Sequence, residues 1–164
     1  MMKAALYLAI GLVMTTLECS LFSFLPTELF KPDLGIPFVI YTAFFLNPFA
    51  GLVTSIFVGL MQEVLSCTPA GSMLFAKVSI FIITLFMKNK LYIDSRYSFS
   101  FACSGAVLVE SFLFLTISLV IQGESRDIGN VMFYAVPNAI VTGFLSLLIF
   151  SLIESLNVRY FDRH

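Results

Sequence analysis

Charged residues and histidine are scarce in this sequence, and both shortages exclude whole classes of protein. Charged residues make up 12% of the chain and hydrophobic ones 59%, a balance too apolar to give a water-soluble domain its polar surface. The single histidine is His164, and the three cysteines (Cys19, Cys67 and Cys103) are far apart, in no metal-binding or redox spacing. We therefore expect no metal site and no cofactor.

Familiar catalytic motifs are also missing. The sequence contains no phosphate-binding Walker loop, no G-x-S-x-G nucleophile elbow and no H-E-x-x-H zinc motif. Tryptophan is absent, and the 19 phenylalanines are more typical of bulky side chains facing lipid than of an aromatic cofactor site. We expect a protein that is not an enzyme.

Long apolar runs fill residues 4–154, and most charges lie in the gaps between them. In lipid every backbone N–H and C=O needs a partner within the protein, so spanning segments are helices or closed barrels. The runs do not alternate polar with apolar residues, which excludes barrel strands. The fold class is therefore an all-α, polytopic membrane protein. At about 20 residues per crossing, the 164 residues allow five or six helices.

Six apolar runs predict the helices of a single transmembrane domain covering residues 1–164. Their bounds are about 4–25, 34–46, 49–65, 72–87, 99–121 and 131–154. The first run resembles a secretory signal, but it is too long and contains Glu18. It also ends in Pro26-Thr27-Glu28 instead of a small-residue cleavage site. We expect this helix to be retained.

The second run is too short to cross a bilayer, which leaves the number of crossings open. Helical residues 34–46 would extend only about 20 Å, against a hydrocarbon core of about 30 Å. Either the second and third runs form a hairpin at Asn47-Pro48, giving six crossings, or residues 34–65 form one kinked helix, giving five. We favour six, because Asn-Pro initiates turns and Pro32 and Pro37 bracket a separate start.

The distribution of lysine and arginine predicts the orientation in the membrane. With six crossings, one side holds Lys31 and Arg126, and the other holds Lys3, Lys88, Lys90, Arg96, Arg159 and Arg163. With five crossings, Lys3 and Lys31 exchange sides and the excess remains. The positive-inside rule therefore predicts a cytoplasmic C-terminus under both alternatives.

Ionisable residues within the predicted spans are costly in lipid and are candidates for function. Glu18 is near the end of its helix and could instead reach the interface, whereas Glu110 is central and must be protonated or paired. Asp33 and Glu154 lie at interfaces, where we expect water to solvate them. The polar residues that we single out inside the membrane are Glu18, Glu63, Lys77, Glu110 and Asn138.

Glu63 and Lys77 flank the turn at residues 66–71, so their two helices should be antiparallel neighbours. Side chains tilt towards the N-terminus of their own helix, which brings the two charges to a similar depth. We predict an ion pair between Glu63 and Lys77.

Two sets of residues recur at every fourth position and predict helix packing. Small residues allow helices to approach closely in lipid, and polar residues join helices by hydrogen bonds. For Asn138, Thr142 and Ser146 we therefore favour helix–helix hydrogen bonding over a ligand site. The small-residue stripes are Gly51, Ser55, Gly59 and Glu63 in one helix, and Ala135, Ala139 and Gly143 in another.

The stretch KPDLGIPFVIYTAFF, followed by PFAGLVTSIFVGLMQEVLSCTPAGSMLF, resembles the MreD family of bacterial rod shape-determining membrane proteins. The resemblance covers residues 32 to about 77, and beyond them the layout of helices and the basic loop at 88–96 agree. The residues that carry it are Pro32, Asp33, Leu34, Gly51, Gly59, Leu60, Glu63, Ser66, Pro69 and Gly71.

The resemblance implies a non-enzymatic component of the cell-elongation machinery in the bacterial inner (cytoplasmic) membrane. Its implied partners are a single-pass MreC-like protein and, directly or through it, MreB and the peptidoglycan synthase pair; no nucleic-acid partner is expected. It also implies the six-helix fold of the substrate-binding subunits of energy-coupling-factor transporters. A vitamin-like small-molecule-binding subunit of such a transporter is therefore the alternative function.

Overall fold

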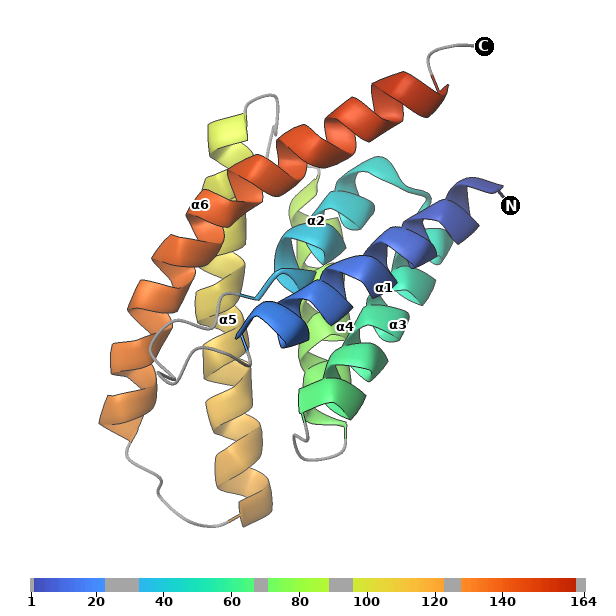
Figure 1. Ribbon diagram of the computed structural model, residues 1–164. Helices are drawn as coiled ribbons and strands as arrows, with labels where there is room; N and C mark the ends of the chain where they lie inside the picture. The colour runs from blue at the N-terminus through green and yellow to red at the C-terminus, as the bar shows by residue number, and fades with distance from the viewer. Residues whose placement is uncertain (1, 23–32, 67–70, 89–95, 123–127, 162–164) are drawn as a thin grey trace.

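The computed structural model describes residues 2–22, 33–66, 71–88, 96–122 and 128–161. Within these residues the chain forms six helices (Figure 1). They are α1 (Met2–Phe22), α2 (Gly35–Phe45), α3 (Pro48–Ser66), α4 (Ser72–Lys88), α5 (Arg96–Gln122) and α6 (Ile128–Phe161). All six predicted helices are confirmed. The observed α6 continues beyond predicted residue 154, because a helix needs no apolar sequence once it has left the hydrocarbon.

The second and third apolar runs form a hairpin and not one kinked helix. Gly35 at the start of α2 lies against Gln62 near the end of α3, and Gly51 lies against the carbonyl of Thr42. Leu46 adopts an extended backbone (ψ 167°) that ends α2 before Pro48 begins α3. The turn predicted at Asn47-Pro48 is therefore correct.

Consecutive helices run antiparallel throughout the described bundle. The start of α1 and the end of α6 therefore lie at the same end of the bundle (Figure 1). In α1 and α2, Gly11 packs on Phe38 and Glu18 reaches Leu34. Contacts between the later helices show the same antiparallel arrangement. They are Gly59 with Leu74 and Gly51 with Phe81 between α3 and α4, Lys77 with Glu110 between α4 and α5, and Ser100 with Gly143 and Arg96 with Glu154 between α5 and α6.

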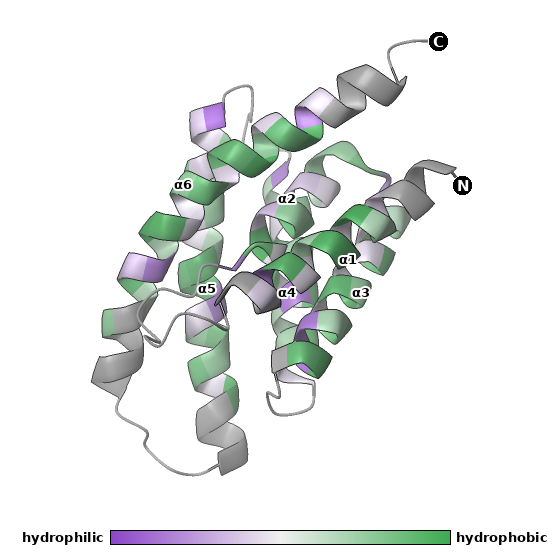
Figure 2. Ribbon diagram, viewed as in Figure 1, coloured by the Kyte–Doolittle hydropathy of each residue, from purple (hydrophilic) through white to green (hydrophobic). Residues whose placement is uncertain are grey.

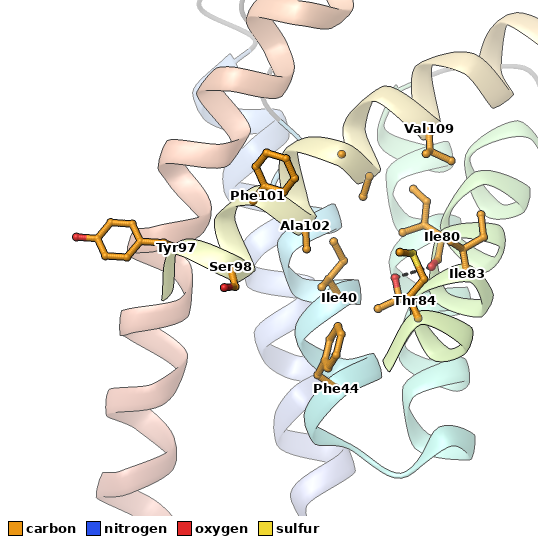
Figure 3. Close-up of a pocket in the computed structure, with 13 residues that line it drawn as sticks. Ile40, Phe44, Ile80, Ile83, Thr84, Tyr97, Ser98, Phe101, Ala102 and Val109 are labelled. Atoms are coloured by element: carbon orange, nitrogen blue, oxygen red, sulfur yellow. Dashed lines mark hydrogen bonds between the residues drawn. The ribbon is translucent and has the colours of Figure 1, made fainter. Parts of the chain in front are cut away.

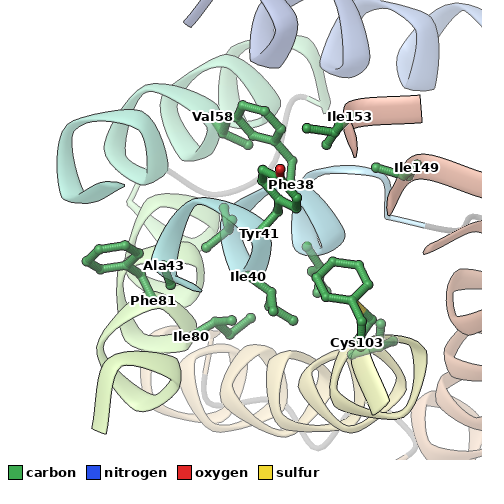
Figure 4. Packing of buried hydrophobic residues seen from close by; sticks show 14 of the residues in the cluster. Phe38, Ile40, Tyr41, Ala43, Val58, Ile80, Phe81, Cys103, Ile149 and Ile153 are labelled. Carbon is green, nitrogen blue, oxygen red and sulfur yellow. The ribbon is translucent and has the colours of Figure 1, made fainter. Parts of the chain in front are cut away.

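The short helix α2 lies at the centre of the bundle. Nine of its 11 residues are buried, and its apolar side chains pack against α3, α4, α5 and α6 (Figure 4). An 11-residue helix is about 16 Å long, about half the thickness of the hydrocarbon core. Its two ends therefore stop inside the protein, and their free backbone groups must be satisfied there.

Apolar side chains also lie exposed on the outside of the bundle, and Figure 2 shows hydrophobic positions along its helices. Phe86, Phe101 and Phe144 are each at least 70% exposed, as suits lipid-facing positions. In the described part of the chain, three segments are long and apolar enough to cross a membrane: Pro48–Leu65, Arg96–Ile117 and Ala135–Ser155. The protein is a helical membrane protein.

Candidate functional site

Lys77 is the centre of a buried charge network. Its side chain is 0% exposed, and its ammonium group makes ion pairs with Asp33 and, at 2.5 Å, with Glu110. Because charges at such buried positions are only weakly screened, each carboxylate needs a direct partner.

Gln62 and Glu18 extend this network into α3 and α1. The Gln62 amide Nε2 donates to both carboxylate oxygens of Glu18, at 3.1 and 3.0 Å, and to Asp33 Oδ1 at 2.9 Å. The charge network, defined as Glu18, Asp33, Gln62, Lys77 and Glu110, therefore joins α1, the start of α2, α3, α4 and α5.

The charge network also caps the buried N-terminus of α2. The first four backbone N–H groups of a helix have no partner within it. Here Leu34 N–H donates to Glu18 at 3.2 Å, and Gly35 and Ile36 donate to Asp33 Oδ1 at 2.8 and 3.2 Å. The next residue is Pro37, which has no N–H. All four positions are thereby accounted for, and the carboxylates also face the positive end of the helix dipole.

The opposite end of α2 is capped by a cation. Lys88, the last residue of α4, donates from Nζ to the carbonyl oxygen of Ala43 at 3.2 Å. Leu46 N–H donates to Thr42 O at 3.0 Å. Acidic groups at its start and a basic group at its end allow this short helix to terminate within the bundle.

The predicted Glu63–Lys77 ion pair is wrong. Glu63 instead accepts hydrogen bonds from the backbone N–H of Gly71 at 2.6 Å and of Leu74 at 3.5 Å, so it caps the N-terminus of α4. Depth and tilt placed the two residues at similar levels but could not show which way each faces around its helix. The solvation expected for Asp33 is wrong for the same reason, since Asp33 binds Lys77.

The other predicted residues have separate positions. Gly59 and Gly51 lie at close contacts of α3 with Leu74 and Phe81 of α4, which confirms that α3 and α4 are neighbours. Thr142 and Ser146 are buried in α6; Ser146 donates to Gly143 O, and Asn138 lies on the same helix. Gly71 has a φ of +87°. Pro32 and Pro69 lie outside the described residues.

Gln62 and Gly35 were missed by the sequence reasoning. Gln62 is neutral and so did not stand out among ionisable residues, although it is the network's bridge. A Cβ at Gly35 would lie 2.8 Å from Gln62 Nε2 and 3.0 Å from Asp33 Oδ1. The order Asp33-Leu34-Gly35-Ile36-Pro37 carries a usable signal, because an acidic residue just before a helix with proline in its first turn is typical of a helix start.

The chemistry that the charge network supports is structural. Its carboxylates, the Lys77 ammonium and the Gln62 Nε2 group bind one another and the start of α2, while Gln62 Oε1 is buried without a hydrogen-bond partner among the described residues. In the part of the chain that the structure describes, no group of three or more His, Cys, Asp or Glu side chains is arranged to hold a metal ion. The network therefore holds five helix elements in a fixed arrangement.

Comparison with known proteins identifies the family. Residues 2–158 match the family described as rod shape-determining protein MreD, which covers nearly all of the 164 residues. Neither curated proteins nor solved structures give a match, and the transporter-subunit alternative finds no support.

Proposed function

We propose that this chain, which belongs to the MreD family of rod shape-determining membrane proteins, is a non-enzymatic scaffold that binds an MreC-like single-pass protein in the cytoplasmic membrane. Through that partner it would connect MreB filaments with the peptidoglycan synthase pair. Its family makes the protein a component of the rod-shape machinery. The scaffolding role and the particular partners are what we propose.

The charge network supports a scaffold more than a carrier of solutes. A carrier has polar groups that face its substrate, whereas the charged side chains at the centre of this bundle bind one another and the N-terminus of α2. Their effect is to fix the relative positions of the helices. A rigid bundle with an apolar outer surface suits binding of another transmembrane helix, which in lipid depends on close packing.

The function is tested by depletion and by purification. Loss of the protein should make a rod-shaped host round, and the protein purified in mild detergent should bring with it a single-pass protein that has a large outer domain. Re-expression of the wild-type chain should restore both. Rod-shaped cells after depletion, or a bound vitamin-like molecule with nucleotide-binding subunits, would contradict the proposal.

We also propose that the chain passes from one side of the membrane to the other six times, with the short α2 covering only part of the depth of the second passage, and that both termini lie in the cytoplasm. The antiparallel order of consecutive helices and the excess of lysine and arginine on one side support this topology. A reporter fused ahead of Lys3 should be cytoplasmic, and one fused after His164 should behave identically. Reporters on opposite sides of the membrane would rule out an even number of crossings.

A further inference from the structure

A cavity of about 620 Å³ opens between α2, α4 and α5. Figure 3 shows Ile40 and Phe44 of α2 facing Ile80 and Thr84 of α4 across it. The Thr84 hydroxyl donates to Ile80 O of its own helix at 2.7 Å, and apart from Thr84, Tyr97 and Ser98 the lining residues are apolar. No lining residue belongs to the charge network, and nothing in the family assignment gives this cavity a role.

Gly105 of α5 keeps this cavity open. The glycines at 51, 59 and 143 have neighbours that a Cβ would meet, but a Cβ at Gly105 would meet nothing within 4 Å. Helix packing therefore does not require glycine here, although glycine costs a helix about 0.5–1 kcal/mol relative to alanine. The missing side chain leaves space in the cavity wall.

The shape of the cavity suits an acyl chain. Along α5 its lining extends from Tyr97 to Val109, which is about 18 Å of helix and close to the ~15 Å depth of one hydrocarbon leaflet. A transmembrane helix about 10 Å wide fills roughly 400 Å³ per turn, so the cavity would hold less than two turns of a partner helix. A flexible chain fits it better.

Phe44, Met87 and Tyr97 line one end of the cavity, and the basic residues Lys88 and Arg96 are next to Met87 and Tyr97 in the chain. Lys88 follows Met87 and is bound to Ala43, the neighbour of Phe44, through one of the three N–H groups of its ammonium. Arg96 precedes Tyr97, and its side chain is 60% exposed although it meets Glu154 at 3.3 Å. The phosphate of an anionic headgroup placed there would accept charge-assisted hydrogen bonds from these cations.

We propose that the cavity binds one anionic phospholipid, with an acyl chain along Gly105 and its phosphate at Lys88 and Arg96. The assignment of this lipid to the cytoplasmic leaflet rests on the topology proposed above. The cavity and the basic residues at its end are observed independently of that topology. The lipid would fill the space between α4 and α5 and stabilise their separation at that end.

Native mass spectrometry of the full chain in detergent with phosphatidylglycerol, and separately with phosphatidylcholine, tests this. We expect one retained phosphatidylglycerol and much less phosphatidylcholine. Gly105→Leu should reduce retention about tenfold, since a leucine side chain in the space of the acyl chain overpacks the site at a cost typical of that fold-change. Gly105→Ala is the matched control and should keep the lipid.

Arg96→Gln should reduce the preference for phosphatidylglycerol. Because the Arg96 side chain is 60% exposed and its ion pair with Glu154 is also exposed, the helix content should stay unchanged. Equal retention of both lipids by the wild type, or full retention by Gly105→Leu, overturns the proposal. So does a photo-crosslinker at Phe101 that captures a partner protein in cells instead of lipid. Because retention is measured on the isolated chain, a failure here leaves the scaffold proposal standing, and a failure of the scaffold proposal leaves this one standing.

Discussion

Lys77→Met should prevent accumulation of the folded protein. Methionine matches the length of lysine but leaves Asp33 and Glu110 buried without their cation. Removing one partner of a buried ion pair typically costs about 3–5 kcal/mol, a large part of the roughly 5–15 kcal/mol that keeps a typical protein folded. Yield and thermal stability in detergent, compared with the wild type, measure the effect.

The controls for this prediction distinguish the observed partners of Lys77 from the one expected from the sequence. Adding Asp33→Asn and Glu110→Gln to Lys77→Met removes the unpaired charges, and asparagine keeps a side-chain oxygen for the start of α2. This triple variant should recover much of the lost stability. Adding Glu63→Gln instead should recover none. Rescue by Glu63→Gln and not by the triple variant would mean that the charge network is wrongly assigned.

Gly59→Leu should separate α3 from α4 and destabilise the bundle. A Cβ at Gly59 would lie 2.8 Å from the Cα of Leu74, and backbone cannot move aside as a flexible side chain can. Overpacking of this kind costs typically 1–3 kcal/mol and occasionally more, and contact with backbone places this variant at about the upper end of that range. Thermal unfolding monitored by circular dichroism in detergent gives the measurement.

Val64→Leu provides the matched control for Gly59→Leu. Val64 lies on the same helix and is 73% exposed, so an added methylene there meets lipid and should leave the unfolding temperature unchanged. If Gly59→Leu unfolds at the same temperature as Val64→Leu, then α3 and α4 are not in close contact at Gly59.

The presence of six helices and their order along the chain were predictable because lipid imposes one strong local rule: a segment that spans it must be helical. The turn at Asn47-Pro48 was predictable for a local reason as well, since it depends on two adjacent residues. The partners of Lys77 were not. They come from residues 44 and 33 positions away, and their choice depends on how α4 is rotated about its axis.

The sequence by itself determined that this is a helical membrane protein of the MreD family, because composition, apolar runs and the motif after the first helix are all local properties. Only the tertiary structure decided that the short α2 is buried at the centre of the bundle. That position explains the charges, since a helix that ends inside a membrane protein needs anions at its start and a cation at its end. Glu18, Lys77 and Glu110, which looked like separate candidates in the sequence, therefore belong to one network at the start of this buried helix, and Lys88 caps its end.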